Sequence, residues 1–259
     1  PKNLSAVVLT HAHLDHSGYI PRLVKDGFTG EVHCTRATRD LCKILLPDSG
    51  FIQEEDAGYA NKEGFSKHSP ALPLYTRREA EVSLRQLVRH DYSEPFEVGP
   101  FSIQFREAGH ILGAANILIS SQGKNILFSG DLGRPNDLLM NPPQTIQPTD
   151  YLVLESTYGD RNHSKTDPLS ELAKIVKKSL TQRSVLLIPA FAVGRAQVIL
   201  YALYRLFEKD PSLKLPVYIN SPMTTSVTEL YEDYLELHKM DRELCRSVCN
   251  LARFVRTAE

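Results

Sequence analysis

Short apolar runs alternate with amphipathic stretches along most of this chain, a pattern typical of an α/β protein. An apolar run at residues 6–9 is followed by a helical pattern, a strand-like run at 31–34 and a second helical pattern to about residue 46. This order predicts a parallel strand, helix, strand unit at the edge of a larger sheet. Residues 47–75 contain repeated proline and glycine, which predicts a loop with short helices.

The middle of the chain predicts an antiparallel sheet. Thr76 and Glu79 have the spacing of a capping box and predict a helix to about residue 89. Strand-like runs follow, and a hairpin turn at Gln122-Gly123 separates the last two; the runs are 101–106, 115–120 and 125–128. Consecutive strands without intervening helices indicate antiparallel pairing.

Helix and strand patterns alternate again after residue 155 and predict a second α/β unit. Asp167 and Pro168 have the residue types of a helix N-cap and first turn. The expected order is a helix to about residue 180, a strand at 185–188, a helix at 195–208, a strand at 217–219 and a helix after Pro222.

Composition adds few constraints. The 259 residues are 42% hydrophobic and 24% charged, as in ordinary globular proteins, and 30 basic against 31 acidic residues give a net charge of −1. A polyanion must therefore be held by local groups rather than by a global field. The longest apolar stretch, 185–193, is too short to span a bilayer, so no membrane partner is expected. Four cysteines without a Cys-x-x-Cys pair suit a reducing compartment, which predicts a cytoplasmic protein.

The strongest chemical signal follows the first apolar run. His11, His13, Asp15 and His16 lie within six residues. If the extended conformation continues, the two-residue period of a strand places His11 and His13 on one side, where they converge on one metal ion. Asp15 and His16 follow where the chain turns, so they face a neighbouring position that suits a second ion.

The motif His-x-His-x-Asp-His after a strand resembles the metallo-β-lactamase superfamily. The segments 108–113 and 128–133 resemble those that supply a third histidine and a bridging aspartate. The run 152–159, with an acid before Ser-Thr-Tyr-Gly, is similar to the β-CASP branch, and 189–197 and 220–223 resemble its cap. Within that branch the chain is most similar to RNA-cleaving members, which include the pre-mRNA 3′-end cleavage factor and its bacterial and archaeal relatives.

The resemblance implies an α/β fold with a partial metallo-β-lactamase αββα sandwich at 1–160, lacking its first strands. It implies the N-terminal part of an inserted α/β β-CASP cap at 161–259. The later histidines of the family have no counterpart in these residues, so the chain is expected to be a fragment truncated at both ends. The alternative is a naturally minimal enzyme that needs a partner or rearranged ligands.

The same resemblance assigns roles to residues. It implies two Zn²⁺ ions, one bound by His11, His13 and His110 and the other by Asp15 and His16, with Asp131 as the bridge. Two such ions can ionise a shared water, which Asp15 would help to orient. The alternatives are a structural histidine at position 110 and a turn aspartate at position 131.

Three further residues are candidates outside the metal ligands. Glu155 is expected to act with a later histidine on the leaving group; the alternative is a structural acid bonded to turn amides. Arg195 and Ser221 are candidates for substrate binding, because a helix N-terminus with a guanidinium or hydroxyl suits a phosphate. The alternatives there are an ordinary helix start and an ordinary cap. The remaining histidines are expected to be structural; these are His33, His68, His90, His163 and His238.

These expectations combine into a zinc-dependent hydrolase that cleaves phosphodiester bonds of single-stranded RNA as an endoribonuclease. A homodimer is compatible with the family, and a nuclear location applies if the chain comes from a eukaryotic processing complex. Two alternatives stay open: a DNA nuclease or other hydrolase on the same dinuclear site, and an inactive scaffold subunit. Inactive paralogues lose metal ligands, whereas all six expected ligands within this span are present.

Overall fold

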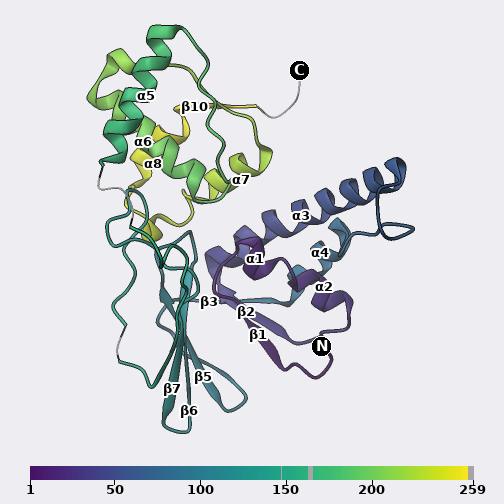
Figure 1. Ribbon diagram of the computed structural model, residues 1–259. Helices are drawn as coiled ribbons and strands as arrows, with labels where there is room; N and C mark the ends of the chain where they lie inside the picture. The colour runs from purple at the N-terminus through teal and green to yellow at the C-terminus, as the bar shows by residue number, and fades with distance from the viewer. Residues whose placement is uncertain (147, 163–165, 256–259) are drawn as a thin grey trace. The chain divides into compact units, whose positions relative to one another are not determined.

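The computed structural model describes residues 1–146, 148–162 and 166–255. The chain has two compact units, one comprising residues 1–135 and 142–155 and the other comprising 136–141 and 156–259. Both contain helices and strands, so the predicted α/β class is confirmed (Figure 1). No helix among the described residues is both long and apolar enough to cross a membrane.

The first sheet of the first unit is parallel. Its order is β1 (Ala6–Val8), β2 (Glu31–Thr35) and β3 (Leu87–His90). Helices α1 (Leu14–Ser17) and α2 (Ile20–Lys25) connect β1 to β2. Helices α3 (Arg36–Glu63) and α4 (Arg77–Ser83) and the 3₁₀ turn Leu84–Gln86 connect β2 to β3. The parallel strand, helix, strand unit expected from the sequence is present.

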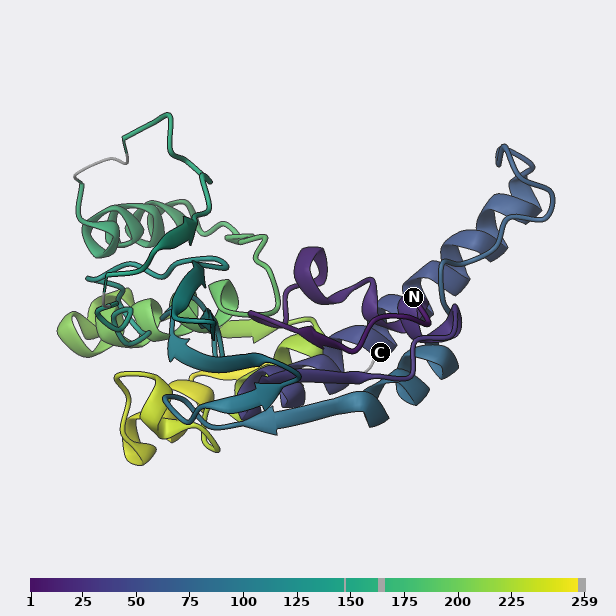
Figure 2. The same ribbon diagram turned by 90° about the horizontal axis from the view of Figure 1, so that it is seen from below.

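Helix α3 corrects the prediction for residues 47–75. It continues through Pro47 to residue 63 and extends well beyond the sheet before the chain returns in the loop that leads to α4 (Figures 1 and 2). Gly50 packs so closely on the chain at Thr76 and Arg77 that an added Cβ would lie 2.7–2.8 Å from their backbone atoms. We infer that this packing offsets the cost of an internal proline. The capping box of Thr76 and Glu79 is confirmed, but α4 ends at residue 83 because 87–90 joins the sheet.

The second sheet has five strands in the order β4 to β8. Its members are β4 (Phe96–Val98), β5 (Phe101–Glu107), β6 (Ala115–Ser121), β7 (Lys124–Phe128) and β8 (Tyr151–Val153). The pairs from β4 to β7 are antiparallel, and β8 joins β7 in parallel. Ile103, Phe105, Ala115 and Ile117 form a buried cluster on this sheet. The predicted hairpin is confirmed, with φ of 51° at Gln122 and 72° at Gly123.

The second unit is built mainly from helices. These are α5 (Pro168–Gln182), α6 (Arg195–Lys209), α7 (Pro222–Leu230) and α8 (Arg242–Cys249), with 3₁₀ turns at Pro211–Leu213 and Leu235–Leu237. Strands β9 (Val217–Ile219) and β10 (Ala252–Phe254) form a parallel pair. Apolar faces of α5 and α6 meet in a core that contains Val176, Leu203 and Phe207. Asp167 caps α5, as predicted.

The prediction of a strand at residues 185–188 is wrong. These residues have no regular secondary structure, and Val185 and Leu187 are 85% and 82% exposed. A strand forms only where a neighbouring strand satisfies its backbone, and nothing among the described residues pairs with this run. Apolar, β-branched composition alone does not supply that partner.

Two glycines with similar backbone angles provide a test of loop packing. Gly113 has φ of +78°, and a Cβ there would lie 2.3 Å from the Thr38 backbone nitrogen; Gly123 has φ of +72° and open space around it. We expect Gly113→Ala to lower the free energy of unfolding by about 2–4 kcal/mol, because left-handed strain and a steric clash add. Gly123→Ala, the control, should cost only about 1–2 kcal/mol of strain. Equal losses in urea denaturation of the full-length variants would contradict the close approach at Gly113.

Candidate metal centre

The segment after β1 delivers the first pair of imidazoles. Strand β1 ends at Val8, so the extended run is shorter than predicted, yet His11 and His13 still converge. His11 Nε2 lies 3.2 Å from His13 Nδ1. His13 is the residue before α1, and that short helix carries Asp15 and His16 to an adjacent position.

The loop between β5 and β6 supplies His110. Its ends are joined by a hydrogen bond from the Ala108 amide to the Ala114 carbonyl, at 2.9 Å. The hydroxyls of Thr35 and Thr38 both donate to the Gly113 carbonyl, which ties the loop to the start of α3. This arrangement places His110 Nε2 3.2 Å from His13 Nδ1.

The turn after β7 supplies Asp131. Gly130 has φ of +54°, and a Cβ at Gly133 would lie 2.0 Å from the Gly109 carbonyl oxygen. The Gly133 amide donates to the Ala108 carbonyl at 2.8 Å. The turn therefore lies directly against the His110 loop, and only glycine at position 133 permits that approach.

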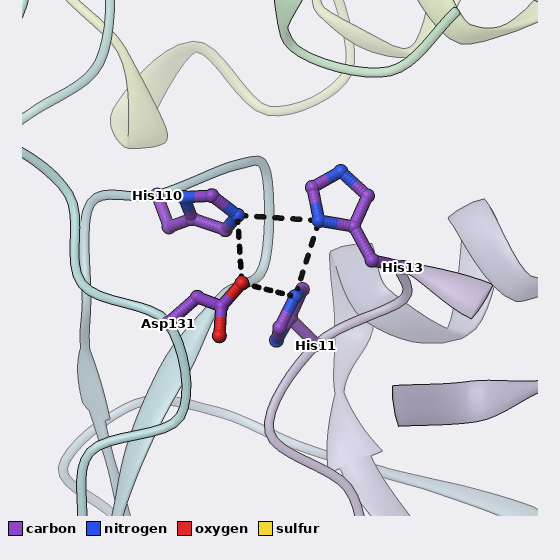
Figure 3. Close-up of side chains that lie close together, drawn as sticks. All are labelled: His11, His13, His110 and Asp131. Carbon is purple, nitrogen blue, oxygen red and sulfur yellow. Dashed lines mark hydrogen bonds and ion pairs between the residues drawn. The ribbon is translucent and has the colours of Figure 1, made fainter. Parts of the chain in front are cut away.

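Four side chains from these three segments face one another (Figure 3). Asp131 Oδ2 lies 3.6 Å from His11 Nε2 and 3.5 Å from His110 Nε2. The other carboxylate oxygen, Oδ1, lies 3.3 Å from His16 Nε2, which is 3.6 Å from Asp15 Oδ2. The six residues singled out as ligands in the sequence thus form two adjacent groups that share Asp131.

The donor atoms fit metal ions better than a hydrogen-bonded cluster. His13 Nδ1 faces the Nε2 atoms of both His11 and His110 at 3.2 Å, and one nitrogen proton cannot serve both contacts. A tetrahedral Zn²⁺ with bonds of about 2.0–2.1 Å places its ligand atoms about 3.3–3.4 Å apart. The observed separations match that geometry, so a cation would satisfy all four donors.

Burial keeps these imidazoles neutral, which is the form that binds metal. Burial, and then the neighbouring histidines, lower the pKa of His11 to about 2. Burial is also the main cause that lowers the pKa of His13 and of His110. The three-histidine group therefore presents lone pairs rather than protons near neutral pH.

Thr10 is a contributor that the sequence reasoning missed. Its hydroxyl lies 3.2 Å from Nδ1 of both His11 and His16. Each ring is therefore held by the nitrogen that does not face the centre, an arrangement that fixes ring orientation in metal sites. The only available signal was its position directly before the motif.

The other three candidate residues lie in a hydrogen-bonded turn or at the start of a helix. Glu155 Oε1 accepts a 2.6 Å hydrogen bond from the Leu132 amide. Arg195 is exposed at the first position of α6, but the first two amides of that helix already donate to Val193 and Phe191. Ser221 Oγ accepts the Thr224 amide at 3.1 Å and so caps α7.

Among the described residues, the other histidines and the cysteines belong to neither of the two ligand groups. His33 Nδ1 and His90 Nε2 form a hydrogen bond of 2.9 Å, and His238 Nε2 donates to the Tyr231 carbonyl. Both contacts agree with structural roles. His163 lies outside the described residues. Cys245 is buried and Cys249 is half-buried, and both are free thiols.

Comparison with known proteins agrees with the geometry. Residues 1–179 match the family model of the metallo-beta-lactamase superfamily, and residues 196–259 match that of the Beta-Casp domain. A ribonuclease of Thermus thermophilus is 38% identical over 89% of this chain and 49% of its own length. The transcription termination factor FttA of Methanocaldococcus jannaschii is 32% identical over 90% of this chain and 36% of its own.

A eukaryotic protein is similar to a comparable extent. The cleavage and polyadenylation specificity factor 73 of Drosophila melanogaster is 31% identical over 90% of this chain and 33% of its own length. The chain thus spans half or less of each of these three relatives. With the metal-ligand geometry and the two domain matches in agreement, the chain belongs to the metallo-β-lactamase superfamily and carries Beta-Casp sequence in residues 196–259.

Proposed function

We propose that the protein containing this chain is a zinc-dependent hydrolase that cleaves RNA phosphodiester bonds as an endoribonuclease. The observation that carries the proposal is the placement of the Asp131 carboxylate. Its two oxygens face different ligand groups, as expected for a residue shared by two ions. Two divalent ions about 3.5–4 Å apart supply an ionised water and stabilise charge on a phosphate undergoing displacement.

The residues of the chain divide the work around such ions. His11, His13 and His110 would hold one Zn²⁺, and Asp15 and His16 the other. The Asp15 side chain is 75% exposed, so it can accept a hydrogen bond from water as well as bind metal. We assign Glu155 to proton transfer at the leaving group, because it lies beside the turn that carries Asp131.

RNA is the proposed substrate because of the relatives. The Thermus thermophilus protein is named a ribonuclease, and the Drosophila melanogaster protein is named a cleavage and polyadenylation specificity factor. Local phosphate contacts must supplement the metals, since the net charge is only −1. The exposed guanidinium of Arg195 supports such a contact, and Ser221 is a weaker candidate because its oxygen already caps α7. Single-stranded RNA, a homodimer and a cytoplasmic location complete the proposal.

The first prediction concerns metal content. The full-length protein should contain two Zn²⁺ per chain, and Asp131→Ala should lower both zinc occupancy and RNA cleavage because one residue serves both groups. His11→Ala should remove the three-histidine ion and activity while the fold is retained. Elemental analysis and single-turnover cleavage provide the measurements. Fewer than about 0.2 zinc per chain, with full activity in EDTA, would rule out the two-metal site.

The second prediction concerns substrate. The full-length protein should cleave single-stranded RNA in preference to duplex DNA and should not hydrolyse a chromogenic lactam. Arg195→Ala should weaken RNA binding by about 1–3 kcal/mol if the guanidinium contacts phosphate. Arg242→Ala is a matched control, because Arg242 is also an exposed first residue of a helix but follows the capping Asp241. Equal cleavage of RNA and DNA would favour a nuclease with broader specificity. Equal RNA affinity of the two variants would show that Arg195 does not contact the RNA.

A further inference from the structure

The turn that carries Asp131 depends on contacts with another segment of the chain to hold its conformation. Asp131 lies between β7 and β8 in a segment without regular secondary structure, and Gly130 gives that segment additional backbone freedom. Yet both Asp131 oxygens must point at separate groups of ligands. A displacement of about 1 Å is enough to spoil a site of this kind. The orientation of the carboxylate must therefore come from contacts on either side of Asp131.

The segment that follows β8 makes those contacts. The Ser129 amide donates to the Val153 carbonyl at 2.9 Å, and the Glu155 amide donates to Ser129 Oγ at 2.9 Å. The Ser129 hydroxyl in turn donates to the Gly130 carbonyl at 2.7 Å. Beyond Asp131, the Leu132 amide donates to Glu155 Oε1 at 2.6 Å. Glu155 thus holds the turn from both sides, with its backbone before Asp131 and its side chain after it.

The side-chain contact is the stronger and more specific of the two. A carboxylate that accepts a backbone amide forms a charge-assisted bond, which is shorter and about twice as strong as a neutral one. The residue after Asp131 is the one whose amide is fixed, so the bond restricts the peptide that joins Asp131 to Leu132. Oε1 of Glu155 is therefore linked to the candidate metal site through the backbone next to Asp131.

We infer that Glu155 is a positioning residue whose side-chain oxygen orients the shared metal ligand Asp131 through the Leu132 amide. This inference rests on the proposed two-metal function and adds a task to the proton transfer assigned to Glu155. Loss of an outer contact of this kind typically weakens metal binding about 10–100-fold. The ion that Asp15, His16 and Asp131 would hold should be the more sensitive. That group offers three residues among those described, whereas His11, His13, His110 and Asp131 offer four.

Two neutral replacements of Glu155, similar in size, distinguish the role of its hydrogen-bond acceptor from the role of its negative charge. Glu155→Gln keeps an oxygen that can accept the Leu132 amide, whereas Glu155→Met does not. In the full-length protein, titration with Zn²⁺ under chelator competition should show affinity within about threefold of wild type for the Gln variant. The Met variant should bind the weaker ion about 10–100-fold less tightly. Turnover should fall in both variants, because both lose the proton-transferring acid.

Glu54→Met is the matched control. Glu54 Oε2 accepts the Arg77 amide at 2.8 Å, the same type of bond in the same unit, but at the packing of α3 on α4. Its zinc affinities should equal those of wild type, even if its stability falls. A general loss of stability would lower metal binding in Glu54→Met and Glu155→Met alike, and that result would overturn the inference.

The remaining outcomes are also decisive. Wild-type zinc affinity in Glu155→Met, or equal losses in the Gln and Met variants, would show that the acceptor does not position Asp131. If Glu155→Met does not fold, hydrogen exchange at the Leu132 amide of the wild-type protein decides: protection supports the bond, and exchange at the rate of an open loop overturns it. Binding of fewer than two ions by wild type would instead contradict the proposed function, since the positioning test compares variants with wild type.

Discussion

The first unit is organised around a group of metal-ligating atoms that three segments of the chain bring close together. The imidazole nitrogens of His11, His13 and His110 and an oxygen of Asp131 approach to 3.2–3.6 Å. Burial favours the neutral form of the imidazoles, which offers lone pairs to a cation. The fold keeps these atoms close together through loops that are hydrogen-bonded to one another and to neighbouring strands.

Close contacts at glycines and hydrogen bonds of threonine hydroxyls hold these loops in place. Gly113 lies against the start of α3, and Gly133 lies against Gly109, so the loop that carries His110 packs both on a helix start and on the turn that carries Asp131. Thr10 holds the outer nitrogens of two histidines, and Thr35 and Thr38 hold the Gly113 carbonyl. These contacts leave little freedom for the ligands to separate. The low pKa of His11 follows from the same crowding and burial.

In the second unit, the two candidate substrate-binding residues, Arg195 and Ser221, both lie at helix starts. Ser221 caps α7, and the amides at the start of α6 are already bonded within the loop before it. These are the bonds that any helix start requires, so they do not by themselves indicate a ligand. The side chain of Arg195 is exposed, and the helix start does not require its guanidinium, so this group is the part of the candidate that can bind a ligand.

Local patterns in the sequence determined the chemistry of the centre and the type of most elements. The spacing from His11 to His16 is a local property, and so are the capping box at Thr76 and the hairpin turn at Gly123. His110 and Asp131 were identified through the resemblance of their segments to those of a known family. Resemblance to a family then assembled these segments into one site before any distance was known.

Tertiary structure decided what depends on partners distant in sequence. Helix α3 continues through Pro47, and its Gly50 packs on the chain at Thr76 and Arg77. Residues 185–188 do not form a strand, since no described strand pairs with them. The bond from Leu132 to Glu155 spans 23 residues and leaves no trace in either local pattern. A side chain's type shows what it can bind, but which backbone amide it meets depends on packing that only the folded chain defines.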